Sequence, residues 1–162
     1  MKRILLNGGG VLLIALACDH GGYELMREVK AYLDSQSLGY KDFGTYSAES
    51  CDYPVIAVKA ARAVANGECG MGIFICGTGA GMAMAANKVP GIRAALCSDC
   101  FTAEMARRHN NANVLTLGAR VTGVGLAIKI VELFLNSGFD GGRHSVRVDM
   151  INALDALDSN ET

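Results

Sequence analysis

Short, continuous apolar runs alternate along this chain with segments whose apolar residues recur every three or four positions. The clearest strand patterns cover residues 11–17, 71–76, 92–97 and 114–117, and a shorter stretch that could be a strand covers 40–43. An unbroken apolar run is typical of a parallel strand buried on both faces. Apolar residues that recur every three or four positions are typical of amphipathic helices. The alternation predicts an α/β fold: a single-domain, three-layer sandwich with a Rossmann-like, mostly parallel five-stranded sheet and helices on both faces.

The expected helices have recognisable limits. Pro54 lacks the N–H that a first helical turn leaves unpaired, so it is expected to open a helix, with Asp52 as its cap. The predicted helices cover Leu25–Leu33, Pro54–Ala65, Met82–Lys88, Asp99–Arg108 and Val124–Leu135, and a last amphipathic stretch carries Val148, Ile151, Leu154 and Leu157. In the helix 124–135, one apolar face is expected to consist of Leu126, Ile130, Leu133 and Phe134.

Composition limits the function classes. The length of 162 residues suits one domain, and 51% hydrophobic residues argue against a disordered chain. A net charge of −1 without a basic block gives no footprint for nucleic acid. The longest apolar run is far too short to span a membrane. We therefore expect no nucleic-acid partner and no membrane association.

The N-terminus imitates a signal peptide, because basic residues precede apolar ones and Ala15-Leu16-Ala17 resembles a cleavage site. Asn7-Gly8-Gly9-Gly10 interrupts that apolar region, and cleavage would remove the first expected strand. We therefore interpret residues 1–10 as an extension outside the core and 11–162 as the domain. The 6 cysteines are then expected to be reduced thiols of a cytoplasmic protein rather than a disulfide framework.

Ligands of an open parallel sheet bind where strands end and loops lead into helices. Cys76 stands at such a point, between an apolar strand and a glycine-rich helix start. The positive end of a helix favours a thiolate, which could act as a general base. The alternative is an ordinary buried thiol, because free cysteine behaves as a small hydrophobe. Position alone leaves the two interpretations balanced.

The segment Gly77-Thr78-Gly79-Ala80-Gly81 also has two interpretations. Free N–H groups in a glycine-rich turn suit a phosphate or an oxyanion formed during reaction. Glycines equally serve a tight turn that needs positive φ. Neither a dinucleotide fingerprint nor a nucleotide-hydrolase phosphate loop fits, because Met82 replaces the third glycine and no Gly-Lys-Ser/Thr follows.

An arginine pair, a cysteine pair and a histidine are further candidates for a functional role. Arg143 and Arg147 lie four positions apart, so on a helix they could clamp a phosphate, although a solvated helix start is the commoner explanation. Cys97 and Cys100 have the spacing of a redox or zinc pair, but the second pair that a structural zinc needs is missing from the sequence. His109 follows its helix and so is expected at the opposite edge of the sheet from Cys76.

With these segments in view, the chain resembles the type B ribose-5-phosphate isomerase family, including relatives that isomerise galactose 6-phosphate. The resemblance runs in order from about Leu13 to the last helix. Its motifs are Ala17-Cys18-Asp19-His20-Gly21-Gly22, Asp52-Tyr53-Pro54, Ile75-Cys76-Gly77-Thr78-Gly79-Ala80-Gly81-Met82, Ala85-Ala86-Asn87-Lys88, Gly91-Ile92-Arg93-Ala94-Ala95-Leu96-Cys97, His109-Asn110-Asn111-Ala112-Asn113 and Phe139-Asp140-Gly141-Gly142-Arg143-His144. One branch of the family has a glutamate base at the position of Met82, so this chain resembles the thiol branch.

The resemblance implies interconversion of D-ribose 5-phosphate and D-ribulose 5-phosphate through an enediolate, in the non-oxidative branch of the pentose phosphate pathway, without metal or organic cofactor. Cys76 would carry the proton between C2 and C1, with Thr78 moving protons between the oxygens. Asp19 and His109 would assist ring opening. The residues implied in substrate binding are His20, Tyr53, Gly77, Gly79, Ala80, Gly81, Asn110, Arg120, Arg143 and Arg147.

The same resemblance implies a homodimer, sometimes paired into a tetramer, whose C-terminal helix packs on the partner and whose site is shared between subunits. That arrangement would bring His109 and the arginines of one subunit to Cys76 of the other. Two alternatives remain at this point. One is isomerisation of a six-carbon substrate such as galactose 6-phosphate or allose 6-phosphate, and the other is a non-catalytic sugar-phosphate-binding protein.

Overall fold

Five parallel strands form one sheet in the computed structural model, which describes residues 13–156. They are β1 (Ile14–Cys18), β2 (Tyr40–Asp42), β3 (Met71–Cys76), β4 (Ala94–Leu96) and β5 (Val114–Gly118), in the order β2-β1-β3-β5-β4. The inner strands β1, β3 and β5 are buried at every position, as the unbroken apolar runs predict. The expected parallel sheet is confirmed, and the predicted extension 1–10 lies outside the described residues.

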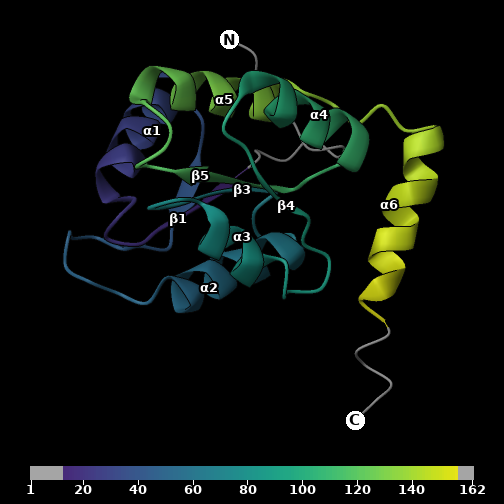
Figure 1. Ribbon diagram of the computed structural model, residues 1–162, viewed down its shortest axis with the longest axis horizontal. Coiled ribbons are helices and arrows are strands. Elements are labelled where there is room, and N and C mark those ends of the chain that lie inside the picture. Colours follow the sequence, from purple (N-terminus) through teal and green to yellow (C-terminus); the bar gives the residue numbers. More distant parts are fainter. Residues whose placement is uncertain (1–12, 157–162) are drawn as a thin grey trace.

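Helices cover both faces of this sheet (Figure 1). One face carries α1 (Tyr23–Ser35), α4 (Cys100–Asn110) and α5 (Val124–Asn136), and the other carries α2 (Tyr53–Ala65) and α3 (Ala80–Ala86). The last helix, α6 (Arg143–Leu154), stands beside the layers and packs against α4 (Figure 1). The three-layer prediction is therefore confirmed. Within residues 13–156, every helix is too short or too polar to cross a bilayer.

The strand order creates a crevice at a defined place. β1 pairs with β2 on one side and with β3 on the other, so the chain changes direction across the sheet between β1 and β3. Loops that leave neighbouring strands in opposite directions open a crevice at the carboxyl edge, where open α/β sheets bind ligands. The residues after Cys18 and after Cys76 therefore face the same space.

Several predicted boundaries need correction. α3 begins at Ala80, not at Met82, because Gly79 closes the preceding turn with φ +81°. β4 is shorter than the apolar run 92–97, since an edge strand pairs with β5 alone. α4 continues to Asn110, so His109 lies within its last turn rather than after it. Asp52 occupies the cap position of α2 as expected, but its side chain makes no capping hydrogen bond.

Within one subunit, the apolar stripe of the last helix is largely exposed, and the resemblance implies that this helix packs on the partner. Only Val148 of α6 is buried, whereas Ile151 is 44% and Leu154 is 58% exposed, and Leu157 lies outside the described residues. α5 shows a smaller departure, because Leu126 is 43% exposed while Ala127 is buried in its place. The helical spacing was correct in both cases, but the surface that each stripe faces depends on neighbours that spacing does not specify.

Candidate active site

Cys76 occupies the last position of β3, and its sulfur is held by the loop that follows. The backbone N–H of Gly79 donates to Sγ of Cys76 at 3.1 Å, and the side chain is 5% exposed. The backbone N–H of Ala119 donates to the carbonyl oxygen of Cys76 at 2.9 Å, which fixes the strand end against the loop after β5. A donated N–H complements negative charge on the sulfur, as a proton-accepting thiolate requires.

The glycines of the 77–81 loop serve different purposes. Gly79 has φ +81°, and an added Cβ would lie 2.5 Å from Cδ1 of Leu96, so this position requires glycine. At Gly81 an added Cβ would lie 2.6 Å from Cζ of Tyr53, so the tyrosine ring lies directly on the loop backbone. At Gly77 the nearest atoms to an added Cβ are those of Arg120, at 3.6 Å, so the Arg120 side chain packs against this glycine. The turn interpretation explains Gly79, and a guanidinium beside Gly77 is compatible with the anion interpretation.

The loop after β1 touches this loop. Asp19 is 7% exposed, and its Oδ1 accepts a hydrogen bond from the N–H of Gly22 at 3.0 Å. An added Cβ on Gly21 would lie 3.2 Å from the nitrogen of Gly77 and 3.3 Å from Oδ1 of Asp19. The Asp19 carboxylate and the start of the glycine loop therefore border one small space at the carboxyl edge.

Polar side chains surround that space from three further segments. The backbone N–H of Arg120 donates to the carbonyl oxygen of Gly77 at 3.0 Å, and the guanidinium group of Arg120 lies over this glycine. Nδ1 of His20 accepts from the N–H of Cys51 at 3.4 Å, which leaves Nε2 as the donor of a neutral ring. Thr78 is exposed, with its Oγ1 accepting from the N–H of Ala80 at 3.4 Å.

The structure thus brings together most of the predicted site. The residues gathered around the carboxyl ends of β1 and β3 are Asp19, His20, Tyr53, Cys76, Gly77, Thr78, Gly79, Ala80, Gly81 and Arg120. They supply a thiol, a carboxylate, a hydroxyl, backbone N–H groups and a cation. Such a set can accept a proton from carbon, move protons between oxygens and stabilise an oxyanion.

His109, Asn110, Arg143 and Arg147 are not part of this group. His109 and Asn110 end α4, and the adjacent Asn113 accepts a hydrogen bond from the N–H of Gly72, at the amino end of β3. The strand from Gly72 to Cys76 covers roughly 13 Å. Within one chain, these residues therefore lie at the opposite edge of the sheet from the sulfur, as expected from the sequence.

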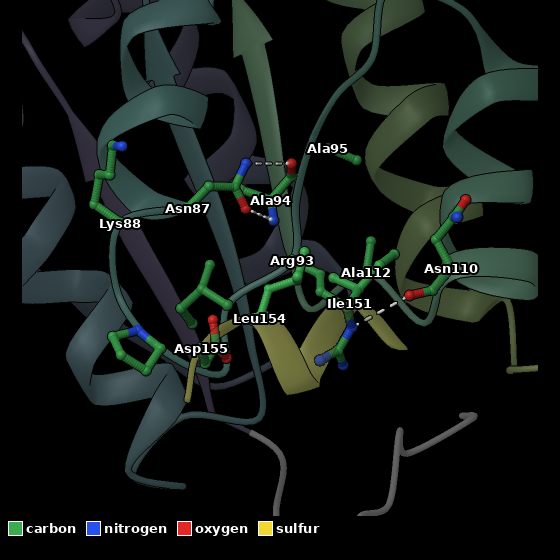
Figure 2. A pocket seen from close by; sticks show the side chains of 12 residues that line it. Asn87, Lys88, Arg93, Ala94, Ala95, Asn110, Ala112, Ile151, Leu154 and Asp155 are labelled. Carbon is green, nitrogen blue, oxygen red and sulfur yellow. Dashed lines mark hydrogen bonds between the residues drawn. The ribbon is translucent and has the colours of Figure 1, made fainter. Parts of the chain in front are cut away.

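A cavity of about 600 Å³ lies on this second side of the molecule, between the β4 region and α6 (Figure 2). Figure 2 shows Arg93 at its centre, where the guanidinium group donates to the carbonyl oxygen of Asn110 at 3.2 Å. It also donates to Oδ1 of Asn152 on α6 at 2.8 Å. The lining includes Asn110, Ile151 and Leu154 but no residue of the loops around Cys76.

Other thiols and possible metal ligands were compared with Cys76. Burial raises the pKa of Cys18 and of Cys97 to about 12, so both remain protonated at neutral pH and are unsuited to proton abstraction. In the part of the chain that the structure describes, no three His, Cys, Asp or Glu side chains are grouped as a metal site would require.

Three contacts of the site were not anticipated from the sequence. They are the Cys51 N–H on His20, the approach of Leu96 to Gly79, and a flat stack of His144 on His109. The motifs that contain His144 and Leu96 carried part of the resemblance, but nothing in their spacing indicates these partners. Contacts between segments far apart in sequence are decided by packing.

Comparisons with known proteins agree with this geometry. A profile of the Ribose/Galactose Isomerase family matches residues 14–151. Ribose-5-phosphate isomerase B of Escherichia coli (strain K12) is 47% identical over 142 residues, which cover 88% of this chain and 95% of that protein.

Solved structures give the same result. Ribose-5-phosphate isomerase B of Clostridium thermocellum has a TM-score of 0.89 and 49% identity, with 91% of this chain and 99% of that one covered. The enzyme of Mycoplasma genitalium, solved with bound ribulose 5-phosphate, has a TM-score of 0.85 and 40% identity, with 93% and 98% covered.

Proposed function

The chain belongs to the ribose/galactose isomerase family, and we propose that it interconverts D-ribose 5-phosphate and D-ribulose 5-phosphate with Cys76 as the proton-transfer base. It is an isomerase of the aldose–ketose type. The observation that carries the assignment of the base is the Cys76 sulfur at a strand end, hydrogen-bonded to the Gly79 N–H beside Asp19 and Arg120.

The proposed reaction uses the groups at the carboxyl edge. After the furanose ring opens with help from Asp19 and His109, the Cys76 thiolate takes the proton from C2 and the C1 carbonyl oxygen becomes an enediolate oxygen. Thr78 moves a proton between O1 and O2, and the Cys76 thiol returns its proton to C1. The N–H groups of residues 77–81 stabilise the charge that develops on oxygen. These groups supply acid–base chemistry and charge stabilisation without a metal or organic cofactor.

We further propose that the working site is formed by two copies of the chain, with His109, Asn110, Arg143 and Arg147 coming from the partner. Support comes from their placement at the opposite edge from Cys76, since one subunit alone cannot bring the two groups to one substrate. The phosphate would then lie between these arginines and the His20 side of the crevice.

Exposed apolar side chains support the same dimer. On α6 they are Val146, Met150, Ile151 and Leu154, and near the carboxyl edge they are Met84, Leu96 and Phe101, all between 44% and 72% exposed. Apolar surface grouped in this way is typical of an interface. A two-fold axis would place each α6 on the other subunit, so that each of the two sites is completed in the same way.

Replacement of the proposed base tests the function. In Cys76→Ala we expect turnover of ribose 5-phosphate to fall by about 10³-fold, because a positioned general base contributes roughly 10²- to 10⁴-fold. Solvent deuterium should enter C2 of ribose 5-phosphate with the native chain and not with the variant. Cys69→Ala, which removes an equally buried thiol before β3, should keep most of the turnover. Near-normal activity of Cys76→Ala would overturn the assignment.

Substrate choice is tested on the unmodified chain. Turnover should be clearly faster with ribose 5-phosphate than with galactose 6-phosphate or allose 6-phosphate. Preference for a six-carbon substrate would keep the isomerase chemistry but replace the proposed substrate. Binding without turnover or deuterium exchange would instead favour a sugar-phosphate-binding protein.

A further inference from the structure

The end of α4 and the start of α6 are fastened together by a short polar contact. Nε of Arg108 donates to Oδ1 of Asp140 at 3.1 Å, and the N–H of Asp140 donates to the carbonyl oxygen of Arg108 at 2.9 Å. Gly141 and Gly142, with φ of +67° and +57°, then turn the chain into α6. This connection holds the two helices side by side although α6 buries little of its own surface (Figure 1).

The connection places two imidazole rings face to face. The ring centroids of His109 and His144 are 4.2 Å apart, and the ring planes differ by 5°. Each ring comes from a different helix and is partly buried. A flat stack restricts rotation of both side chains, because turning either ring out of the plane gives up this contact.

The surroundings of His144 favour its uncharged form. Burial lowers its pKa, and the neighbouring His109, Arg143 and Arg147 lower it further, while Asp140 acts in the opposite direction. The Asp140 carboxylate is already engaged by Arg108. An uncharged ring at this position avoids the repulsion that two charged rings at this distance would experience.

We propose that His144 is a positioning residue: its flat ring, stacked on His109, holds that imidazole in the orientation required for opening the furanose ring. This inference rests on the proposed function, in which His109 assists ring opening. His144 itself need not touch the substrate. Its contribution is the orientation of a neighbouring acid–base group, to which catalytic steps are sensitive.

The two sugar phosphates allow this role to be isolated. Ribose 5-phosphate closes into a furanose through its C4 hydroxyl, so the enzyme must open the ring before proton transfer. Ribulose 5-phosphate cannot form the corresponding ring, because its C5 oxygen carries the phosphate. Exchange of a C1 proton of ribulose 5-phosphate with solvent therefore needs Cys76 but no ring opening.

The experiment compares His144→Ala and His144→Phe in the full-length protein. His144→Ala should lower kcat with ribose 5-phosphate by roughly tenfold, since misplaced catalytic groups cost up to about 10²-fold. Deuterium exchange at C1 of ribulose 5-phosphate should change by less than about twofold, because that process bypasses His109. His144→Phe, which keeps a flat ring, should recover most of the lost turnover. Ser145→Ala, on the same helical turn, is the matched control.

Three results would overturn the proposal: unchanged turnover in His144→Ala, equal loss of turnover and exchange, or a His144→Phe variant as slow as His144→Ala. If His144→Ala does not fold by circular dichroism, His144→Leu replaces it with the same outcomes, because leucine keeps volume without a flat ring. Failure of the proposed function would look different. The unmodified chain would then exchange the C1 proton of ribulose 5-phosphate no faster than Cys76→Ala does.

Discussion

The two halves of the proposed site are built in opposite ways. The Cys76 half lies at the end of a strand buried along its whole length, and its loops are fixed by backbone hydrogen bonds such as Asp19 N–H to Ile75 O at 3.2 Å. The half that carries His109 and Arg147 lies on helix ends, and its last helix buries a single side chain, Val148. The first half is thus prepared by the core of its own subunit, whereas the second depends on surface contacts.

This difference indicates what each half contributes. Proton transfer at carbon requires groups held to within a fraction of an ångström, and a buried strand end provides such rigidity. A phosphate clamp built from arginines tolerates more movement, because long side chains adapt to the anion. We propose that packing of α6 on the partner subunit adds to the Arg108–Asp140 connection in making the second half rigid.

The largest expected effect tests whether the two halves come from different subunits. Assayed at ribose 5-phosphate concentrations well below KM, Cys76→Ala and Arg147→Met should each lose about 90% or more of native turnover as homodimers. Coexpressed, they should recover about a quarter of native turnover, because half of the dimers are mixed and each has one intact site. Turnover of the unfractionated coexpressed protein is the measurement, and the purified mixed dimer should reach about half of native turnover. No recovery would show that Cys76 and Arg147 serve the same subunit's site.

The next effect concerns the phosphate clamp. Arg143→Met and Arg147→Met should each raise KM for ribose 5-phosphate by roughly 10- to 100-fold, as loss of a charge-assisted hydrogen bond costs about 1.5–3 kcal/mol. Inhibition by inorganic phosphate should weaken in parallel. Arg62→Met, an exposed arginine on α2, is the control. Unchanged KM in both variants would remove these arginines from the site.

A stability measurement tests whether the Cys76 half of the site is packed more tightly than the half that carries α6. Gly81→Ala should lower the free energy of unfolding by about 1–3 kcal/mol, because the added Cβ meets the Tyr53 ring. The loss should shrink in a Tyr53→Ala background. Gly138→Ala, in the loop before α6, has nothing within 4 Å of the added Cβ and should be neutral to slightly stabilising. Urea unfolding measures both, and equal losses would contradict the contrast.

The smallest effect concerns alkaline pH. Burial raises the pKa of Cys18 and Cys97 to about 12 from an ordinary value near 9.0. Between these values the unfolded state binds fewer protons than the folded state, so stability falls as pH rises above about 9. By pH 9.5 each thiol should cost about 0.8 kcal/mol.

The measurement is urea unfolding at pH 7.5 and at pH 9.5. Cys18→Ala should show a smaller decline between the two pH values than the unmodified chain. Cys51→Ala, which removes a more accessible thiol, is the matched control. An unchanged decline in Cys18→Ala would contradict burial of that thiol in solution.

Much of the fold was predictable because strand, helix and turn patterns depend on residues that are neighbours in the sequence. The strand Met71–Cys76 was predicted with its correct limits, since six successive residues without charge indicate a strand buried on both faces. Gly79 was correctly placed in a tight turn, because a glycine-rich segment between strand and helix needs positive φ. The prediction failed where neighbours decide exposure, as at Leu126.

The candidate site likewise has features that the sequence predicts and features that only tertiary packing decides. The sequence by itself determined the sheet, the thiol at a strand end and the position of His109 at the far end of its helix, because each follows from local periodicity and the direction of the chain. Only the tertiary structure decided that Cys51 orients His20, that Tyr53 covers Gly81 and that His144 stacks on His109. These contacts join segments far apart in sequence, and their geometry depends on how whole helices and loops pack together.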